Sequence, residues 1–244
     1  MKIQNFHLSK LGNPSKEYED SLSFDLKKGR FAIADGASGS TFSDIWARSL
    51  TETFVNSRID LFGDTNGIMG QMVSTSRDYW YDNINWKALP WFLKNKSISG
   101  SYSTFLALQI KKVTGRLKFK SISVGDSCMF ILEGNKIKNS FPIKVPEEFG
   151  NNPKLIWSGQ GSPVKKSLKV PEPELLEFSG GLEKNETVIL ATDAAAKWIM
   201  EATEYAMNLF LNDFQSLDSK IPKLINEGKI KNDDFTVSLL EFTD

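Results

Sequence analysis

The stretch that decides the fold is RFAIADG, residues 30–36, a largely apolar run that ends in Asp35 and Gly36. A short apolar run bounded by turn residues predicts a buried strand. The preceding run SLSFDL, residues 21–26, is separated from it by Lys28 and Gly29, which predicts a β-hairpin. Asp35 would then stand at the end of a buried strand, held by a rigid scaffold and within reach of solvent.

Outward from this hairpin, the sequence predicts blocks of helices and blocks of strands. The expected elements are helices over 41–57, 67–95 (broken before Pro90) and 194–227, strands over 103–110, 117–124, 128–132, 187–192 and 235–242, and an irregular insertion over 141–173. Ser43 and Asp44 are the expected start of the first helix. The three central strands are joined by short turns, which predicts a meander and a largely antiparallel sheet. The order of elements indicates an α+β fold rather than an alternating α/β fold.

Composition excludes several classes of protein. Of the 244 residues, 40% are hydrophobic and 25% are charged, which is typical of a folded globular chain. Lysine plus arginine equals aspartate plus glutamate at 30 each, which argues against nucleic acid or an anionic membrane as the main partner. The single cysteine, Cys128, permits no internal disulfide, and the single histidine, His7, argues against a Ser-His-Asp or Cys-His mechanism. The N-terminus has no apolar run typical of a signal peptide, so a cytoplasmic location is expected.

Acidic residues fall at the ends of predicted strands. They are Glu19 and Asp20 before the hairpin, Asp35 after it, Asp126 in a turn, Asp193 after VILAT, and Asp233 and Asp234 before the last strand. If these ends converge, the carboxylates repel one another unless protons or cations neutralise them. Oxygen ligands favour hard ions such as Mg²⁺ or Mn²⁺. Aspartate is also common in turns and helix caps, so spacing alone does not establish convergence.

These segments resemble, in order, the motifs of the metal-dependent, 2C-type protein phosphatases (the PPM family). FAIADGASG at 31–39 is similar to the family's Asp-Gly motif. The other similar segments are YEDS at 18–21, GSYSTFLAL at 100–108, SVGDSCMFIL at 123–132, VILATDA at 188–194 and NDDFTVSLL at 232–240. The resemblance covers residues 17–242, and each piece is weak alone, but their shared order is a specific signal.

The resemblance implies a single domain over 1–244 with an αββα sandwich, a two-metal centre and a flap-like insertion at about 141–173. By that resemblance, the residues that would hold two Mn²⁺ or Mg²⁺ ions directly or through water are Asp35, Gly36, Asp193, Asp233, Glu19, Asp20 and Asp126. Asp35 would bridge both ions, and Gly36 would bind one through its carbonyl. Of Asp233 and Asp234, only one should face the ions, because neighbouring strand residues point to opposite faces; the motif selects Asp233.

The activity implied is hydrolysis of phosphoserine and phosphothreonine in a phosphoprotein, by an activated water that bridges the two ions. The chain departs from the family pattern at four positions. Where the family has a phosphate-binding arginine this sequence has Ser15, with Lys16 beside it as a possible substitute. Ala37 replaces a histidine found in some members, Ala194 replaces a glycine, and Lys197 replaces a carboxylate that helps to bind a third ion.

Two alternatives remain open at the level of sequence. A catalytically weak or inactive relative could bind a phosphoprotein or a regulatory partner as an interaction module, and the lost arginine and Lys197 favour this. An aromatic cluster could instead stack on sugars or single-stranded nucleic acid; its members are Tyr79, Trp80, Tyr81, Trp86, Trp91 and Phe92. Aromatic residues at this density are more often core. Lys197 is expected either near Asp126 or turned to solvent.

Overall fold

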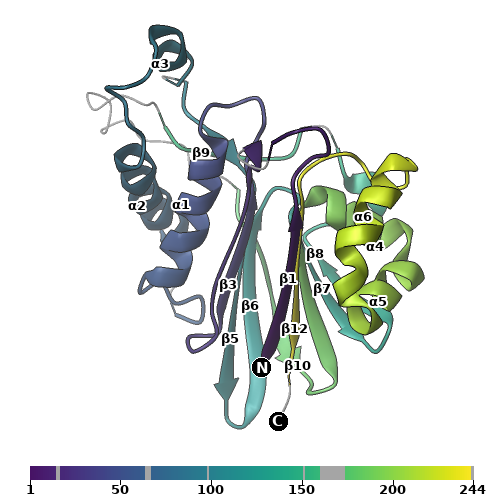
Figure 1. Cartoon of the computed structure of the whole chain (residues 1–244). Coiled ribbons are helices and arrows are strands. Elements are labelled where there is room, and N and C mark those ends of the chain that lie inside the picture. The colour runs from purple at the N-terminus through teal and green to yellow at the C-terminus, as the bar shows by residue number, and fades with distance from the viewer. Residues whose placement is uncertain (15–16, 64–66, 98, 151, 160–173, 243–244) are drawn as a thin grey trace.

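Two five-stranded antiparallel sheets stack face to face in the computed structural model, which describes residues 1–14, 17–63, 67–97, 99–150, 152–159 and 174–242 (Figure 1). The β12 sheet contains, in spatial order, β1 (Lys2–Leu8), β12 (Phe235–Glu241), β11 (Glu186–Ala191), β7 (Cys128–Glu133) and β8 (Lys136–Phe141). The β3 sheet contains β10 (Leu176–Leu182), β6 (Arg116–Val124), β5 (Phe105–Val113), β3 (Arg30–Asp35) and β2 (Asp20–Asp25). A short pair, β4 (Tyr102–Ser103) and β9 (Ile156–Trp157), lies beside them.

Helices cover the outer face of each sheet, so the fold is the α+β, αββα sandwich that was predicted (Figure 1). Those over the β3 sheet are α1 (Ser43–Asn56) and α2 (Ile68–Asp82). Those over the β12 sheet are α4 (Asp193–Glu201), α5 (Thr203–Asn212) and α6 (Leu217–Asn226), with the 3₁₀ turns η2 (Pro146–Glu148) and η4 (Phe214–Ser216). A further helix, α3 (Trp91–Ser97), projects from one end.

The strand RFAIAD is apolar throughout because both of its faces are buried. Phe31 and Ile33 point between the two sheets, whereas Ala32 and Ala34 point toward the helices. The small alanine side chains leave room for the aromatic ring of Trp46 on α1. A strand has a side-chain period of two, so this alternation fixes which face of β3 each residue covers and leaves Asp35 at the end.

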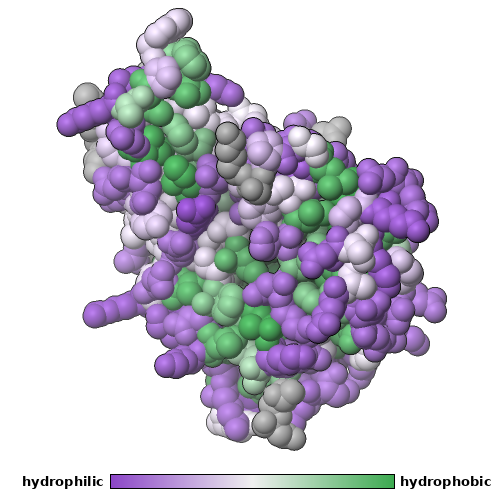
Figure 2. Space-filling view, in the orientation of Figure 1, coloured by the Kyte–Doolittle hydropathy of each residue, from purple (hydrophilic) through white to green (hydrophobic). Residues whose placement is uncertain are grey.

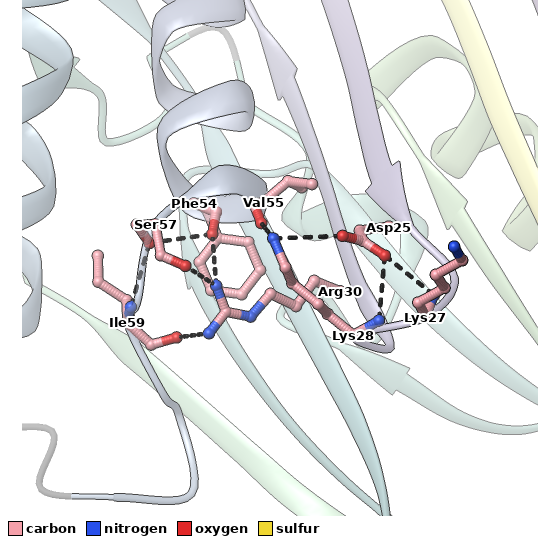
Figure 3. A network of polar contacts seen from close by, with 8 residues as sticks. All are labelled: Asp25, Lys27, Lys28, Arg30, Phe54, Val55, Ser57 and Ile59. Atoms are coloured by element: carbon pink, nitrogen blue, oxygen red, sulfur yellow. Dashed lines mark hydrogen bonds and ion pairs between the residues drawn. The ribbon is translucent and has the colours of Figure 1, made fainter.

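Arg30 fastens the start of β3 to the end of α1 (Figure 3). Its guanidinium is buried and donates hydrogen bonds to the carbonyl oxygens of Phe54, Ser57 and Ile59. The last carbonyls of a helix have no partner within the helix, and a cation there also complements the helix dipole. Arg30 therefore holds α1 against the sheet at the end of β3 opposite to Asp35.

Several sequence-based expectations were wrong in detail. The turn at Gly125 and Asp126 does not join neighbouring strands of one meander, because β6 lies in the β3 sheet and β7 lies in the β12 sheet. β1, β8 and β10 were not predicted as strands. The start of α1 at Ser43 is confirmed; Phe42 precedes it at φ 63°, and no side chain caps the helix. The Ser43 hydroxyl instead donates to Glu19.

The break expected before Pro90 in the helical region over 67–95 is confirmed, because residues 83–90 form turns between α2 and α3. Trp80 lies in the core as expected for a clustered aromatic residue, but Trp91 is 76% exposed and Phe92 is 56% exposed on the projecting α3. Figure 2 shows apolar side chains gathered at this corner of the molecule. Within the described residues, no helix is both long and apolar enough to cross a bilayer.

The predicted flap-like insertion over 141–173 is described only in part. Its first residues complete β8, and η2 and β9 follow. Residues 160–173 lie outside the described part of the chain.

Candidate active site

The ends of β3 and β11 and the start of β12 lie at one end of the sandwich (Figure 1). The acidic residues there come from both sheets and act on one another electrostatically. Asp20 and Asp35 are opposite each other in the register of β2 and β3. The Oδ2 atom of Asp20 accepts hydrogen bonds from the hydroxyls of Thr192 at 2.9 Å and Thr236 at 2.5 Å. Both threonines belong to the β12 sheet side, so Asp20 ties the ends of the two sheets together.

The backbone of Asp35 is held on both sides. Its N–H donates to Thr104 Oγ1 at 2.9 Å, and its carbonyl accepts from the N–H of Thr104 at 2.9 Å and from the hydroxyl of Ser103 at 2.8 Å. Ser103 and Thr104 come from the GSYST segment, far from Asp35 in the sequence. The direction of the Asp35 side chain is thus set by a rigid backbone.

Burial and mutual repulsion raise the pKa values of the acidic side chains at this end. Burial raises the pKa of Asp35 well above its usual value, and the charges of Asp20, Asp193, Asp126 and Asp233 raise it further. Burial also raises the pKa of Asp20 well above its usual value. The pKa of Asp126 is raised to about 6, by burial and then by the charge of Asp193. Groups shifted in this way by burial and like charge are typical of functional sites.

Two carboxylate oxygens at this end are buried without a hydrogen-bond partner in the described part of the chain. They are Oδ1 of Asp20 and Oδ1 of Asp126. A buried unpaired polar atom costs free energy, and an unpaired charged oxygen costs more. These two oxygens are therefore positions at which a bound cation, or water held by one, would be stabilising.

Asp193 and Asp233 both form an ion pair with Lys231. The Lys231 ammonium is 3.0 Å from Asp193 Oδ2 and 2.6 Å from Asp233 Oδ2. Burial lowers the pKa of Lys231, but the hydrogen bond to Asp233 and the charge of Asp193 outweigh it, and the pKa is raised above its usual value. Sequence reasoning missed Lys231, although it stands two residues before Asp233 in the same KNDD segment.

Asp234 has a different environment from its neighbour Asp233. Its Oδ1 accepts the N–H of Lys10 at 2.9 Å, and its Oδ2 accepts the N–H of Glu19 at 2.6 Å. Asp234 thus clamps both ends of the segment that leads from β1 into β2. Asp233 is the one of the two whose charge acts on Asp35.

Glu19 lies at the rim of the same end. Its carboxylate accepts the hydroxyl proton of Ser43, and burial raises its pKa. Glu19 and Asp233 line a polar cavity of about 370 Å³. The remaining lining residues are Lys10, Asn13, Glu17, Ser38, Ser40, Phe42, Ser43, Asp44 and Asp234. This cavity is large enough to admit a small polar ligand beside the acidic cluster.

Gly36 sits where no side chain fits. A Cβ atom there would lie 2.7 Å from the carbonyl oxygen of Ser43 and 2.8 Å from that of Glu19. Its N–H donates to Glu19 O at 3.2 Å, and it forms an isolated bridge with Ser103. The glycine allows the chain to pass close between these backbones directly after Asp35.

The oxygen atoms of the acidic cluster are the kind of ligand that hard divalent ions such as Mg²⁺ and Mn²⁺ prefer. It offers carboxylate oxygens, two of them buried and unpaired, and Lys231 is a cation already bound between two of the acids. As they stand, no three His, Cys, Asp or Glu side chains among the described residues are grouped closely enough to enclose an ion. Binding would therefore require the side chains to close around the ion.

Of the positions at which the sequence departs from the PPM pattern, some lie outside the described residues and others can be placed in the structure. Lys16, the suggested substitute for a phosphate-binding arginine, lies outside the described residues, as does Ser15. Lys197 does not approach Asp126; it is 3.9 Å from Glu201 on the same helix, and its side chain is 44% exposed. The solvent-facing alternative is thus confirmed for Lys197. The cation whose charge reaches Asp126 is Lys231.

Comparison with known proteins gives a match in fold only. No protein-family model matches the sequence, and no curated protein matches it. Among solved structures, a bacterial serine phosphatase matches with a TM-score of 0.65 at 12% identity, covering 100% of this chain and 98% of that one. The serine/threonine phosphatase PstP/Ppp of Mycobacterium tuberculosis matches with a TM-score of 0.63 at 14% identity, covering 100% and 99%.

The catalytic domain of PstP in complex with two manganese ions also matches, with a TM-score of 0.60 at 14% identity, covering 100% of this chain and 98% of that one. The fold of this chain is therefore that of the PPM-type serine/threonine phosphatases, as the sequence motifs led us to expect. At this level of identity the likeness establishes the fold and leaves the activity to be argued from the site.

Proposed function

We propose that this protein is a metal-dependent phosphatase that hydrolyses phosphoserine and phosphothreonine monoesters in a phosphoprotein. The observation that carries the proposal is the meeting of acidic side chains from both sheets at one end of the sandwich. That cluster has buried, unpaired oxygens and raised pKa values of Asp35, Asp20 and Asp126, so it favours bound cations. The fold it shares with solved serine/threonine phosphatases, one of them in complex with two manganese ions, supports the same activity.

In this proposal Asp35, the Gly36 carbonyl, Asp193 and Asp233 hold two Mn²⁺ or Mg²⁺ ions. When bound, the ions supply charge neutralisation and a water of lowered pKa, oriented for in-line attack on phosphorus. The rigid backbone of Asp35 fixes the centre of the site. Gly36 lets the chain after Asp35 pass close to the backbones of Ser43 and Glu19.

Three further acids complete the proposed arrangement. Asp20, held by two threonine hydroxyls, keeps the sheet ends together, and its second carboxylate oxygen is buried without a partner in the described part of the chain. Glu19 at the cavity rim and Asp126 would position water. Neither Cys128 nor His7 is required as a nucleophile. We further propose that the whole chain, 1–244, is one such domain with a flap-like insertion at 141–173, acting in the cytoplasm.

The direct test is hydrolysis of an aryl phosphate by the purified protein with and without Mn²⁺ or Mg²⁺. We expect turnover that depends on the metal and stops with a chelator. Asp35→Asn should lower kcat/KM by roughly 10²-fold or more, on the order of 3 kcal/mol in the barrier, because one side chain would serve both ions. The matched control is Asp25→Asn, which changes the far end of the same hairpin and should leave turnover unchanged.

The second candidate function is an interaction module without turnover. The position of Lys231 between Asp193 and Asp233 and the alanine at position 37 favour it. A well-folded protein that shows no metal-stimulated turnover of aryl phosphate or phosphopeptide would replace the enzyme proposal with this one. Phosphopeptides carrying phosphoserine, phosphothreonine or phosphotyrosine would then define what the module binds.

A further inference from the structure

The acidic cluster contains its own cation. Lys231 stands in the loop between α6 and β12, and its ammonium lies between carboxylates that come from the start of α4 and from the loop before β12. Each of these carboxylates has a further hydrogen bond to a backbone N–H: Asp193 Oδ1 accepts from Ala194 at 2.6 Å, and Asp233 Oδ1 accepts from Asp234 at 3.2 Å. The two side chains are thus oriented so that one oxygen of each faces Lys231.

A cation in this position and a divalent ion bound by both carboxylates exclude each other. Both use Asp193 Oδ2 and Asp233 Oδ2, and like charges at short range repel. A divalent ion can enter only if the ammonium leaves, and the lysine can leave because its side chain is 60% exposed and carried on a flexible stem. Asp35 is not an ion-pair partner of Lys231 within the described residues.

We propose that Lys231 is a built-in competitor for the metal site. It neutralises the Asp193–Asp233 pair in the metal-free protein and weakens the binding of the one ion that needs both carboxylates. This inference rests on the proposed function, since it assumes that an ion binds there. An ion held by Asp35 and the Gly36 carbonyl would not compete with the ammonium. Metal binding should therefore occur in two steps of different affinity, of which only the weaker step responds to residue 231.

The test is a titration of the metal-free protein with Mn²⁺, following free Mn²⁺ by electron paramagnetic resonance and heat by calorimetry. Lys231→Met removes the ammonium and keeps an unbranched side chain. We expect the dissociation constant of the weaker Mn²⁺ step to fall roughly tenfold. Two partly exposed ion pairs, those of Lys231 with Asp193 and Asp233, together contribute about 1.4 kcal/mol, which is the free energy of a tenfold change. Lys231→Arg keeps the charge and should leave the weaker step close to that of the unmodified protein.

The matched control is Lys229→Met in the same loop. Lys229 is 64% exposed, close to the 60% of Lys231, and pairs with Glu227 at 2.8 Å rather than with the acidic cluster. Its replacement removes the same charge from the same region and should leave both Mn²⁺ steps unchanged. An equal tightening in both methionine variants would show a general effect of net charge and overturn the proposal.

The remaining outcomes are also decisive. If the unmodified protein and Lys231→Met bind Mn²⁺ with the same constants, Lys231 does not compete and this proposal fails, while the proposed function stands. If both are folded and neither binds Mn²⁺, this proposal and the proposed function fail together. The metal-free melting temperature gives a second readout: Lys231→Met should lower it, since the two carboxylates lose their cation, and Lys229→Met should not.

Discussion

Replacing Asp234 by alanine should destabilise the fold without removing a residue that we propose as a metal ligand. The side chain is 9% exposed and accepts two backbone N–H groups, those of Lys10 at 2.9 Å and Glu19 at 2.6 Å. Alanine leaves both N–H groups without this partner. These donors lie at the two ends of one segment, so a single change removes both of these hydrogen bonds, while the bonds of Leu11 with Asn232 and of Tyr18 with Thr236 remain.

The magnitude follows from the number and kind of bonds lost. A hydrogen bond to a charged acceptor contributes about 1.5–3 kcal/mol, and water can reach this partly buried segment, so the lower end applies to each bond. The expected loss in the free energy of unfolding is about 3 kcal/mol. For a domain of this size that corresponds to a fall in melting temperature of about 6 to 12 °C. Asp234→Asn keeps one acceptor oxygen and should lose roughly half as much.

The assay is thermal unfolding of the metal-free protein, monitored by circular dichroism and calorimetry. The control Asp25→Ala also removes an acceptor of two backbone N–H groups, those of Lys27 and Lys28, but in an exposed turn. It should lower the melting temperature by less than about 3 °C. If Asp234→Ala is as stable as Asp25→Ala, the clamp has no energetic role and the reasoning is refuted.

Three other changes test the surroundings of the site. Gly36→Ala should lower both the melting temperature and turnover, because its Cβ would lie within 2.8 Å of two backbone oxygens, whereas Gly39→Ala, with no atom within 4 Å of its Cβ, should be neutral. Asp126 has a raised folded pKa of about 6, so its contribution to stability is full below the unfolded value near 3.9 and is lost as pH rises through about 6. The metal-free melting temperature should therefore fall between about pH 4 and 6, and a profile that Asp126→Asn does not flatten would contradict this assignment. Lys16→Ala should raise KM for small phosphate esters more than it lowers kcat, and an unchanged KM would make Lys16 an ordinary surface residue.

The local sequence predicted the strand that carries Asp35 because its burial on both faces leaves an unbroken apolar run. The same logic missed β1, in which only Phe6 is buried, and β10, which is mostly exposed and contains Gly180 and Gly181. Edge strands of this kind bury too little to leave an apolar pattern in the sequence. The sequence also could not assign β7 to the β12 sheet, because an apolar pattern predicts a strand but does not specify which strands pair with it.

In the candidate site, too, features set by the local sequence could be predicted, and contacts between distant segments could not. That Asp35 would stand at a strand end was clear from the sequence, and the ordered motifs selected Asp233 over Asp234. The partners of Asp234, however, are 224 and 215 residues away in the chain, so its clamp could not be inferred. Lys231 was missed for a related reason: a flexible lysine beside an acidic motif is usually exposed, and only the fold places Asp193 within its reach.

The most direct test of the central claim is anomalous diffraction from crystals soaked in Mn²⁺. We predict two manganese peaks at the end of the sandwich where β3 finishes and β12 begins. An oxygen of Asp35 should contact both ions, Asp193 and Asp233 should contact one of them, and the Lys231 ammonium should have moved away. Density without manganese at this end, with Lys231 still between Asp193 and Asp233, would contradict the account.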